Sequence, residues 1–171
     1  GPGGGRAGGG PRGPPGSSNR RWKMKPGTIP PTPLGVTTDQ VKTNPGINNP
    51  GLVEPAGPTD PQVRFIRVQT ADAKPLALLA NYSLHYVGGV GPGHISADYF
   101  GAFAGKIGQL LGAGPEFVGF MSNGTSGDIN NIDFRGGQAR EGPYGRIQIV
   151  ANDVAQAVAA AVKTVKHAGS V

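Results

Sequence analysis

The sequence contains no cysteine in its 171 residues, which excludes disulfides, thiolate metal sites and cysteine nucleophiles. This absence does not assign a compartment, because exported proteins can also lack cysteine. No apolar run approaches the ~18 residues that a membrane-spanning helix needs. No signal peptide is visible either, since glycines and prolines stand where its apolar segment would be. Because the chain has no cysteine, any catalysis must use other side chains.

Acidic residues are scarce at one end of the chain. The sequence has 16 Lys and Arg against 10 Asp and Glu, a net charge of +6. Six of the cations precede the first acid, Asp39, so from residue 26 onward the ten remaining cations face ten acids. The folded part is therefore neutral, and we expect no specific binding of nucleic acid by it.

Composition divides the chain into three parts. Residues 1–20 are rich in Gly, Pro and Arg and lack apolar side chains, which predicts a disordered low-complexity tail. Residues 21–61 contain nine prolines, with scattered apolar residues, and predict an extended strap laid over the surface. From residue 62 the spacing of the apolar residues changes to that of strands and helices, which predicts an α/β domain over residues 62–171. Because the chain begins with Gly and stops soon after a helical pattern, we expect a piece of a longer protein.

The α/β part begins with two expected strands. Val63–Thr70 and Leu76–Leu84 flank a turn at Asp72–Pro75, which predicts an antiparallel pair. The nearly continuous apolar run of Leu76–Leu84 is typical of a strand covered on both faces. A third buried strand is expected at Phe117–Met121.

Two amphipathic helices are expected beside these strands. The first begins after Ser96, a suitable N-cap, and its inner face carries Tyr99, Phe103, Ile107, Leu110 and Leu111. Its Gly105 and Gly108 either weaken the helix or mark close packing against the sheet. The second ends near Gly169, and its apolar stripe is Ile147, Val150, Val154, Ala157, Val158, Ala161 and Val165. The fold class predicted is α/β, a layered sheet with flanking helices.

The first group of chemically active residues follows the second strand. His85 stands one residue past the apolar run, where a neutral imidazole is either a metal ligand or bonded to a backbone carbonyl. His94 lies nine residues on and is either a second ligand or an exposed loop residue. Asp98 falls in the first helical turn, where it either supports such a site or complements the helix dipole.

The second group is the densely polar stretch Ser122–Asn131, directly after the third strand. Gly124 and Gly127 permit sharp turns, so backbone N–H groups could stabilise an oxyanion. The candidates within it are hydroxyl nucleophiles at Ser122, Thr125 and Ser126, a base or positioning acid at Asp128, a donor at Asn130 and a supporting amide at Asn123. The alternative is an Asx-rich turn held by its own side chains.

The glycine-rich loop Gly88–Gly93 raises the alternative of a nucleotide-binding domain. Its sequence fits neither phosphate-binding pattern, GxGxxG or GxxxxGK[ST]. Pro92 also removes a backbone donor that such a loop would use. A mobile loop over a site is the better interpretation.

Three stretches together resemble the N-terminal catalytic domain of the neutral/alkaline non-lysosomal ceramidase family, in particular its divergent bacterial members. These are Ala80–Tyr86, Ile95–Gly101 and Ser122–Asn131, in the family's order, within a resemblance over residues ~21–171. The resemblance implies a zinc amidase that cleaves the N-acyl bond of a lipid, usually outside the cytoplasm. It implies that His85 binds zinc and that Ile95–Gly101 belongs to the same site.

The resemblance also implies a departure at the proposed catalytic serine. The family's Gly-Asp-Val-Ser-Pro-Asn segment is similar to Gly127–Asn131, which places Asn130 at the serine. Asparagine is no ordinary acyl nucleophile, so hydrolysis would fall to zinc-bound water or to Ser126. The family's earlier His ligand and later Glu and Tyr ligands have no counterpart in this chain, so we expect an incomplete zinc site in it.

Two function classes follow. The first is a zinc-dependent, ceramidase-like hydrolase of an N-acyl amide or ester in a lipid-like substrate, acting outside the cytoplasm. The second is an inactive binding module whose basic tail contacts anionic polymers or lipid headgroups at a membrane surface.

Overall fold

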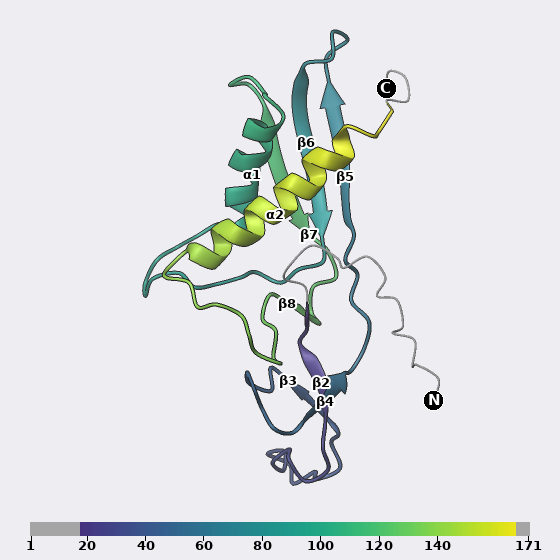
Figure 1. The fold of residues 1–171 in the computed structure, drawn as a ribbon, viewed down its shortest axis with the longest axis vertical. Coiled ribbons are helices and arrows are strands. Elements are labelled where there is room, and N and C mark those ends of the chain that lie inside the picture. The colour runs from purple at the N-terminus through teal and green to yellow at the C-terminus, as the bar shows by residue number, and fades with distance from the viewer. Residues whose placement is uncertain (1–17, 167–171) are drawn as a thin grey trace, which may run out of the picture.

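Residues 18–166 are described by a computed structural model, and they form a mixed α/β fold with three small sheets and two helices (Figure 1). The predicted layered sheet with flanking helices is confirmed. Residues 1–17 of the predicted tail lie outside the described residues. At the end of the predicted tail, Ser18–Asn19 form strand β1, and Asn19 is buried.

The main sheet has the strand order β5-β6-β7. Strand β5 (Val63–Gln69) runs antiparallel to β6 (Pro75–Tyr82), as the turn between them predicts. Strand β7 (Val118–Asn123) is parallel to β6, and helix α1 (Asp98–Leu110) connects the two. This is a βαβ unit, in which both parallel strands end at the same edge.

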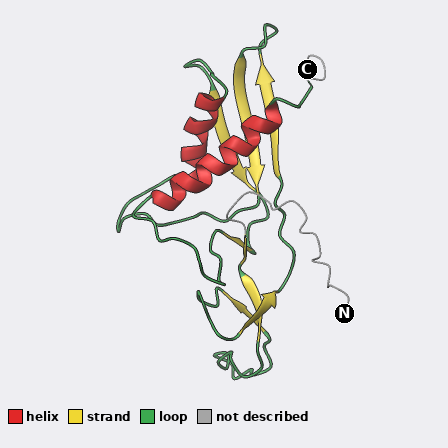
Figure 2. Ribbon diagram, in the orientation of Figure 1, coloured by secondary structure: helices red, strands yellow, loops and turns green. Residues whose placement is uncertain are grey.

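Both helices cover the same face of this sheet (Figure 2). On α1 the predicted Tyr99, Phe103 and Ile107 are buried, whereas Leu110 is exposed. Helix α2 (Gly145–Val162) crosses α1 and completes the core. Within residues 18–166, neither helix is long and apolar enough to cross a membrane.

The predicted stripe of α2 was partly wrong. The helix ends at Val162 rather than near Gly169, and Ala157 and Val165 are exposed. Alanines on both sides of the helix made the periodicity ambiguous. The buried face is Ile147, Val150, Ala151, Val154, Ala155, Val158, Ala159 and Val162.

The opposite face of the main sheet is open, which contradicts the prediction that the second strand is covered on both faces. Its middle row pairs Leu79 with Ile66 on one side and Phe120 on the other. Ile66 is 65% exposed and Phe120 46% exposed. An unbroken apolar run shows that side chains on both faces are apolar, and it does not show that two layers cover them.

The proline-rich region forms a second sheet, of order β3-β2-β4, at the other end of the molecule (Figure 1). Its strands are β2 (Arg21–Met24), β3 (Val41–Thr43) and β4 (Leu52–Pro55). Its inner residues Trp22 and Met24 pack with Phe134 from a distant loop. The expected strap is therefore a short sheet with its own apolar cluster, and the prolines limit its strands to four residues or fewer.

A two-residue pairing joins this region to the candidate site. Strand β1 (Ser18–Asn19) is antiparallel to β8 (Ile129–Asn130). Strand β8 lies in the polar stretch that follows β7, so the N-terminal segment holds that stretch in place.

Glycine packing between α1 and β7 gives a first prediction. A Cβ at Gly119 would lie 2.8 Å from the Ala104 carbonyl oxygen and 2.9 Å from Ile107 Cγ2, whereas one at Gly105 would meet nothing within 4 Å. We expect Gly119→Ala to lower the free energy of unfolding by about 1–3 kcal/mol through overpacking. Gly105→Ala should raise it by roughly 0.5–1 kcal/mol through helix propensity. Urea denaturation checks both values, and equal effects of the same sign would contradict this account.

Candidate functional site

The shared edge where β6 and β7 end brings the segment that leads into His85 beside the polar stretch Ser122–Asn131. The N–H of Gly124 donates to the Tyr82 carbonyl over 2.9 Å. The side-chain amide of Asn81 donates to the Ser122 hydroxyl, also over 2.9 Å. A Cβ on Gly124 would lie 2.6 Å from the Ser83 hydroxyl, so glycine permits this approach. The two strand ends are thus in contact.

His85 lies in the middle of this edge. Its backbone N–H donates to the Ile129 carbonyl over 3.3 Å, which places the histidine beside the polar turn. Its ring Nδ1 is 3.4 Å from the Tyr86 carbonyl oxygen, a contact that favours a proton on Nδ1. In that tautomer Nε2 carries the lone pair that a metal would use.

Tyr99 fixes the backbone just before His85. Its hydroxyl donates to the Leu84 carbonyl over 2.8 Å, and the side chain is fully buried. Burial raises the pKa of Tyr99 above its ordinary value, so the hydroxyl keeps its proton and remains a donor. Helix α1 therefore positions the end of β6.

Asp98 holds the backbone just after His85. One carboxylate oxygen accepts from the N–H of Val87 over 2.9 Å and of Tyr99 over 2.7 Å, and the other accepts from Gly88 over 2.8 Å. Asp98 has φ of 53°, a left-handed conformation that is strained for a residue with a side chain. The expected N-cap Ser96 instead accepts the Asp98 N–H over 3.0 Å.

His94 is bonded to α2 rather than to the polar turn. Its ring Nδ1 is 2.5 Å from the Tyr144 hydroxyl, and the Tyr144 N–H donates to Gly89 over 2.9 Å. Tyr144 is also left-handed, with φ of 62°. A small cavity of about 390 Å³ opens beside His94 and Asp98. No sequence signal marked Tyr144 because its partner is fifty positions away.

The polar stretch is held partly by its own side chains. Asn123 donates to the Ser126 hydroxyl over 2.9 Å. Asn130 accepts the N–H of Asn131 over 2.7 Å and donates to Asn44 over 3.3 Å. Within the described part of the chain, the backbone N–H groups of Thr125, Ser126 and Gly127 have no hydrogen-bond partner. These three donors remain available to a ligand.

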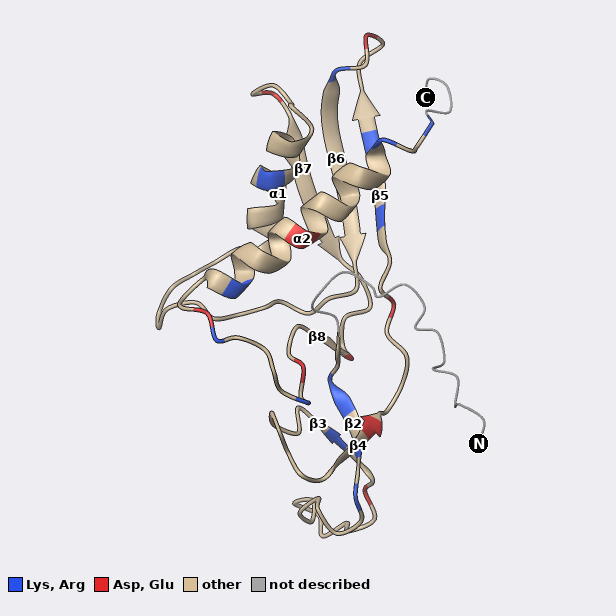
Figure 3. Ribbon diagram, in the orientation of Figure 1, with Lys and Arg blue, Asp and Glu red and all other residues tan. Residues whose placement is uncertain are grey.

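Asp128 forms an ion pair with Arg21 of β2. Its carbonyl accepts the Arg20 N–H over 2.6 Å, and the Arg20 guanidinium reaches the Gly127 carbonyl over 3.4 Å. The sequence shows adjacent arginines, but more than 100 positions separate them from Asp128. Charged residues elsewhere are spread over both sheet regions (Figure 3).

The Gly88–Gly93 loop offers little to a phosphate. Gly88, Gly89 and Gly93 are all left-handed, as a tight loop requires. The Gly88 N–H is already bonded to Asp98. This geometry gives the nucleotide-binding alternative no support.

Among residues 18–166, no group of three or more His, Cys, Asp or Glu side chains could hold a metal ion. In the described part of the chain, the His85 ring makes a hydrogen-bonding contact only through Nδ1, so Nε2 could bind a metal. Zinc stays a prediction.

The comparison with known proteins found one solved structure that is similar to this chain. No family model and no curated protein matches the sequence. The neutral ceramidase from Pseudomonas aeruginosa is similar in structure, with a TM-score of 0.44 and 17% sequence identity. The match covers 84% of this chain and 21% of that one, so the chain spans about a fifth of its length. The ceramidase-like prediction therefore rests on the sequence motifs.

Proposed function

We propose that this chain is part of a zinc-dependent, ceramidase-like hydrolase that cleaves an N-acyl amide or ester bond in a lipid-like substrate. The observation that carries the proposal is the sheet edge at which the His85 N–H donates to the Ile129 carbonyl. Within residues 18–166, it brings a histidine whose Nε2 has no hydrogen-bond partner beside a turn with unpaired backbone donors. The motif resemblance supports the reaction class and a location outside the cytoplasm.

Each group has a distinct part in this proposal. His85 would bind the metal through Nε2, and the N–H groups of Thr125, Ser126 and Gly127 would hold the oxyanion. Zinc, when bound, polarises an acyl carbonyl and lowers the pKa of a bound water. Asp98 and Tyr99 position the backbone on either side of His85. Asn123 orients the Ser126 hydroxyl.

The surroundings of Ser126, Asp128 and Asn130 favour water, rather than a side chain, as the nucleophile. Among the described residues, no histidine or carboxylate bonds the Ser126 hydroxyl, so this serine lacks a base. Asp128 is held in an ion pair with Arg21, and this pairing suits Asp128 to a positioning role better than to proton transfer. Asn130 can donate through its amide, and no nucleophilic role is assigned to it.

Zinc content tests this proposal. In the longest natural form of the protein, we expect about one zinc per chain, falling at least roughly tenfold in His85→Ala, because a metal ligand is lost. His94→Ala is the matched control and should retain zinc, since no hydrogen bond among the described residues joins His94 to His85 or to the polar turn. Metal analysis measures both, together with hydrolysis of short N-acyl amides and esters.

A folded, monodisperse wild-type protein without zinc would overturn the proposal. The binding module with a basic tail would then be the better function. Salt-sensitive binding to anionic vesicles that disappears on deletion of residues 1–17, a deletion that leaves β1 and β2 in place, would support it.

A further inference from the structure

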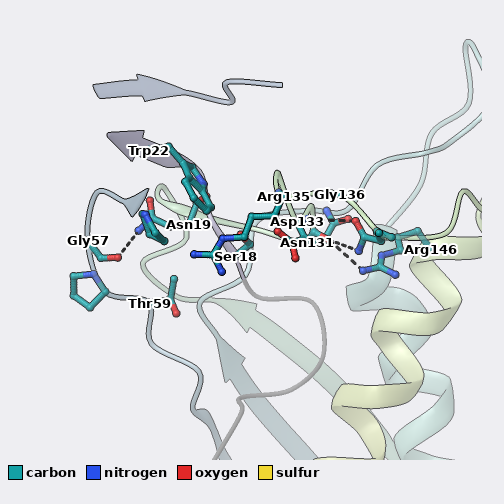
Figure 4. A pocket seen from close by; sticks show the side chains of 14 residues that line it. Ser18, Asn19, Trp22, Gly57, Thr59, Asn131, Asp133, Arg135, Gly136 and Arg146 are labelled. Atoms are coloured by element: carbon teal, nitrogen blue, oxygen red, sulfur yellow. Dashed lines mark hydrogen bonds between the residues drawn. The ribbon is translucent and has the colours of Figure 1, made fainter. Parts of the chain in front are cut away.

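A second cavity, of about 700 Å³, lies where the smaller sheet meets the loop after β8 and the start of α2 (Figure 4). Its volume is within the ~300–1,000 Å³ typical of small-molecule sites. Its wall comes from β1, β2, the segment after β4, the loop after β8 and the start of α2. No residue named in the zinc proposal lines it.

Arg135 presents a free cation to this cavity. Its guanidinium carbon lies 5.1 Å from the centre of the Trp22 ring, so the side chain is held by a cation–π contact. Figure 4 shows the guanidinium below Trp22. Among residues 18–166 it forms no ion pair. The nearby Asp133 carboxylate instead accepts the Arg135 backbone N–H over 2.9 Å.

The loop that carries Arg135 is firmly anchored. The Asn48 N–H donates to the Phe134 carbonyl over 2.8 Å, and Phe134 is buried against Trp22. Gly136 has φ of 89°, and a Cβ there would lie 2.1 Å from the Asn48 side-chain oxygen. The left-handed backbone at Gly136 favours glycine, and the guanidinium is therefore presented from a defined turn.

Arg146, at the opposite end of the cavity, is already engaged. It donates to the Asn131 carbonyl over 3.2 Å and lies 3.7 Å from Glu141. Gln138 donates to the same carbonyl over 2.9 Å. Arg146 therefore fixes the end of the polar turn through its terminal nitrogens, although its buried Nε has no hydrogen-bond partner among the described residues. Arg135 is the arginine of the cavity that forms no ion pair with residues 18–166.

We propose that this cavity binds a small organic anion, a carboxylate or phosphate monoester, whose charged group pairs with Arg135 and whose apolar body lies along Pro55 and Pro58. The lining supports this class because it holds two arginines against one aspartate, together with apolar rings and the hydroxyls of Ser18 and Thr59. A planar guanidinium matches either anion with two parallel hydrogen bonds. The site does not depend on zinc.

Trp22, the single tryptophan of the chain, reports on the cavity directly. Hexanoate and hexyl phosphate are titrated separately in zinc-free buffer, with hexanamide as the uncharged counterpart, and tryptophan emission is followed. We expect saturable binding of one or both anions, at least about tenfold tighter than hexanamide, because a charge-assisted pair is lost in the amide. The comparison of the two anions distinguishes carboxylate from phosphate.

Arg135→Gln should weaken anion binding at least about tenfold, for the same reason. Arg64→Gln removes an exposed arginine that does not line the cavity and should leave the affinity within about twofold, since surface pairs contribute little. Calorimetric titration of each variant separates lost binding from an altered tryptophan signal. Absence of saturation with both anions, equal affinity for hexanamide, or unchanged affinity in a folded Arg135→Gln would each overturn the proposal. Loss of zinc in His85→Ala with unchanged anion affinity would show that the two sites are independent.

Discussion

Phe103→Ala is expected to lower the free energy of unfolding by about 3–5 kcal/mol, the range found when a fully buried aromatic side chain is removed. Phe103 has no exposed surface and lies on the inner face of α1, one turn from both Tyr99 and Ile107. These side chains meet the inner face of β6 and the apolar face of α2 in one cluster. The alanine leaves a cavity where helices and sheet converge.

Phe120→Ala is the matched control for this prediction. It deletes the same atoms from the open face of the main sheet, where Phe120 is 46% exposed, and should cost about 1 kcal/mol or less. Urea denaturation followed by far-UV circular dichroism measures both variants. A loss of similar size at both positions would show that another molecule or segment covers the open face. Tryptophan emission in the same titrations reports on the separate cluster around Trp22.

The main sheet and α1 follow from local patterns in the sequence. The turn between β5 and β6, with an expected strand on either side, predicts an antiparallel hairpin. The 3–4 spacing of Tyr99, Phe103 and Ile107 predicts the buried face of α1. Each of these features depends on residues close in the sequence. The open face of the sheet could not be foreseen, because the pattern of a strand contains no information about what lies beyond it.

The smaller sheet shows why long-range pairing was missed. Strands β2, β3 and β4 have at most four residues each, too short for alternation to stand out among prolines. What stabilises them is the contact of Trp22 with Phe134, whose ring centres are 6.5 Å apart in an edge-to-face arrangement. These two residues are far apart in the chain, and neither carries a local signal for the other.

The position of the candidate site could be predicted from the sequence, but its hydrogen bonds and ion pairs could not. Parallel strands that end together bring Ser83–His85 and the polar stretch to one edge, and this follows from topology. The bond of Tyr144 to His94 and the ion pair of Arg21 with Asp128 depend on how α2 and β2 pack. Sequence patterns identify which residues are chemically able to act, and packing decides which of them are already paired.

Asp98→Ala is the second substitution with a large expected effect, a loss of about 2–4 kcal/mol in the free energy of unfolding. The carboxylate accepts from three backbone N–H groups, and bonds to a charged acceptor contribute about 1.5–3 kcal/mol each, without full additivity. Alanine must also adopt the left-handed conformation at φ of 53°, which costs roughly 1–2 kcal/mol. Hydrogen exchange at Val87 and Gly88 should accelerate by more than the global loss of stability, because their shared acceptor is gone.

Asp98→Asn separates the contributions to this effect. Asparagine tolerates the left-handed conformation and keeps one carbonyl oxygen, so it should lose about half as much stability as alanine. Asp72→Ala removes an exposed aspartate paired with Lys74 in the β5–β6 turn and should change stability by about 0.5 kcal/mol or less. If Asp98→Ala behaved like Asp72→Ala, the carboxylate would not hold the segment after His85. If zinc binding fell in Asp98→Asn while the global stability changed little, the carboxylate would position His85 for the metal, the role given to it in the proposed hydrolase.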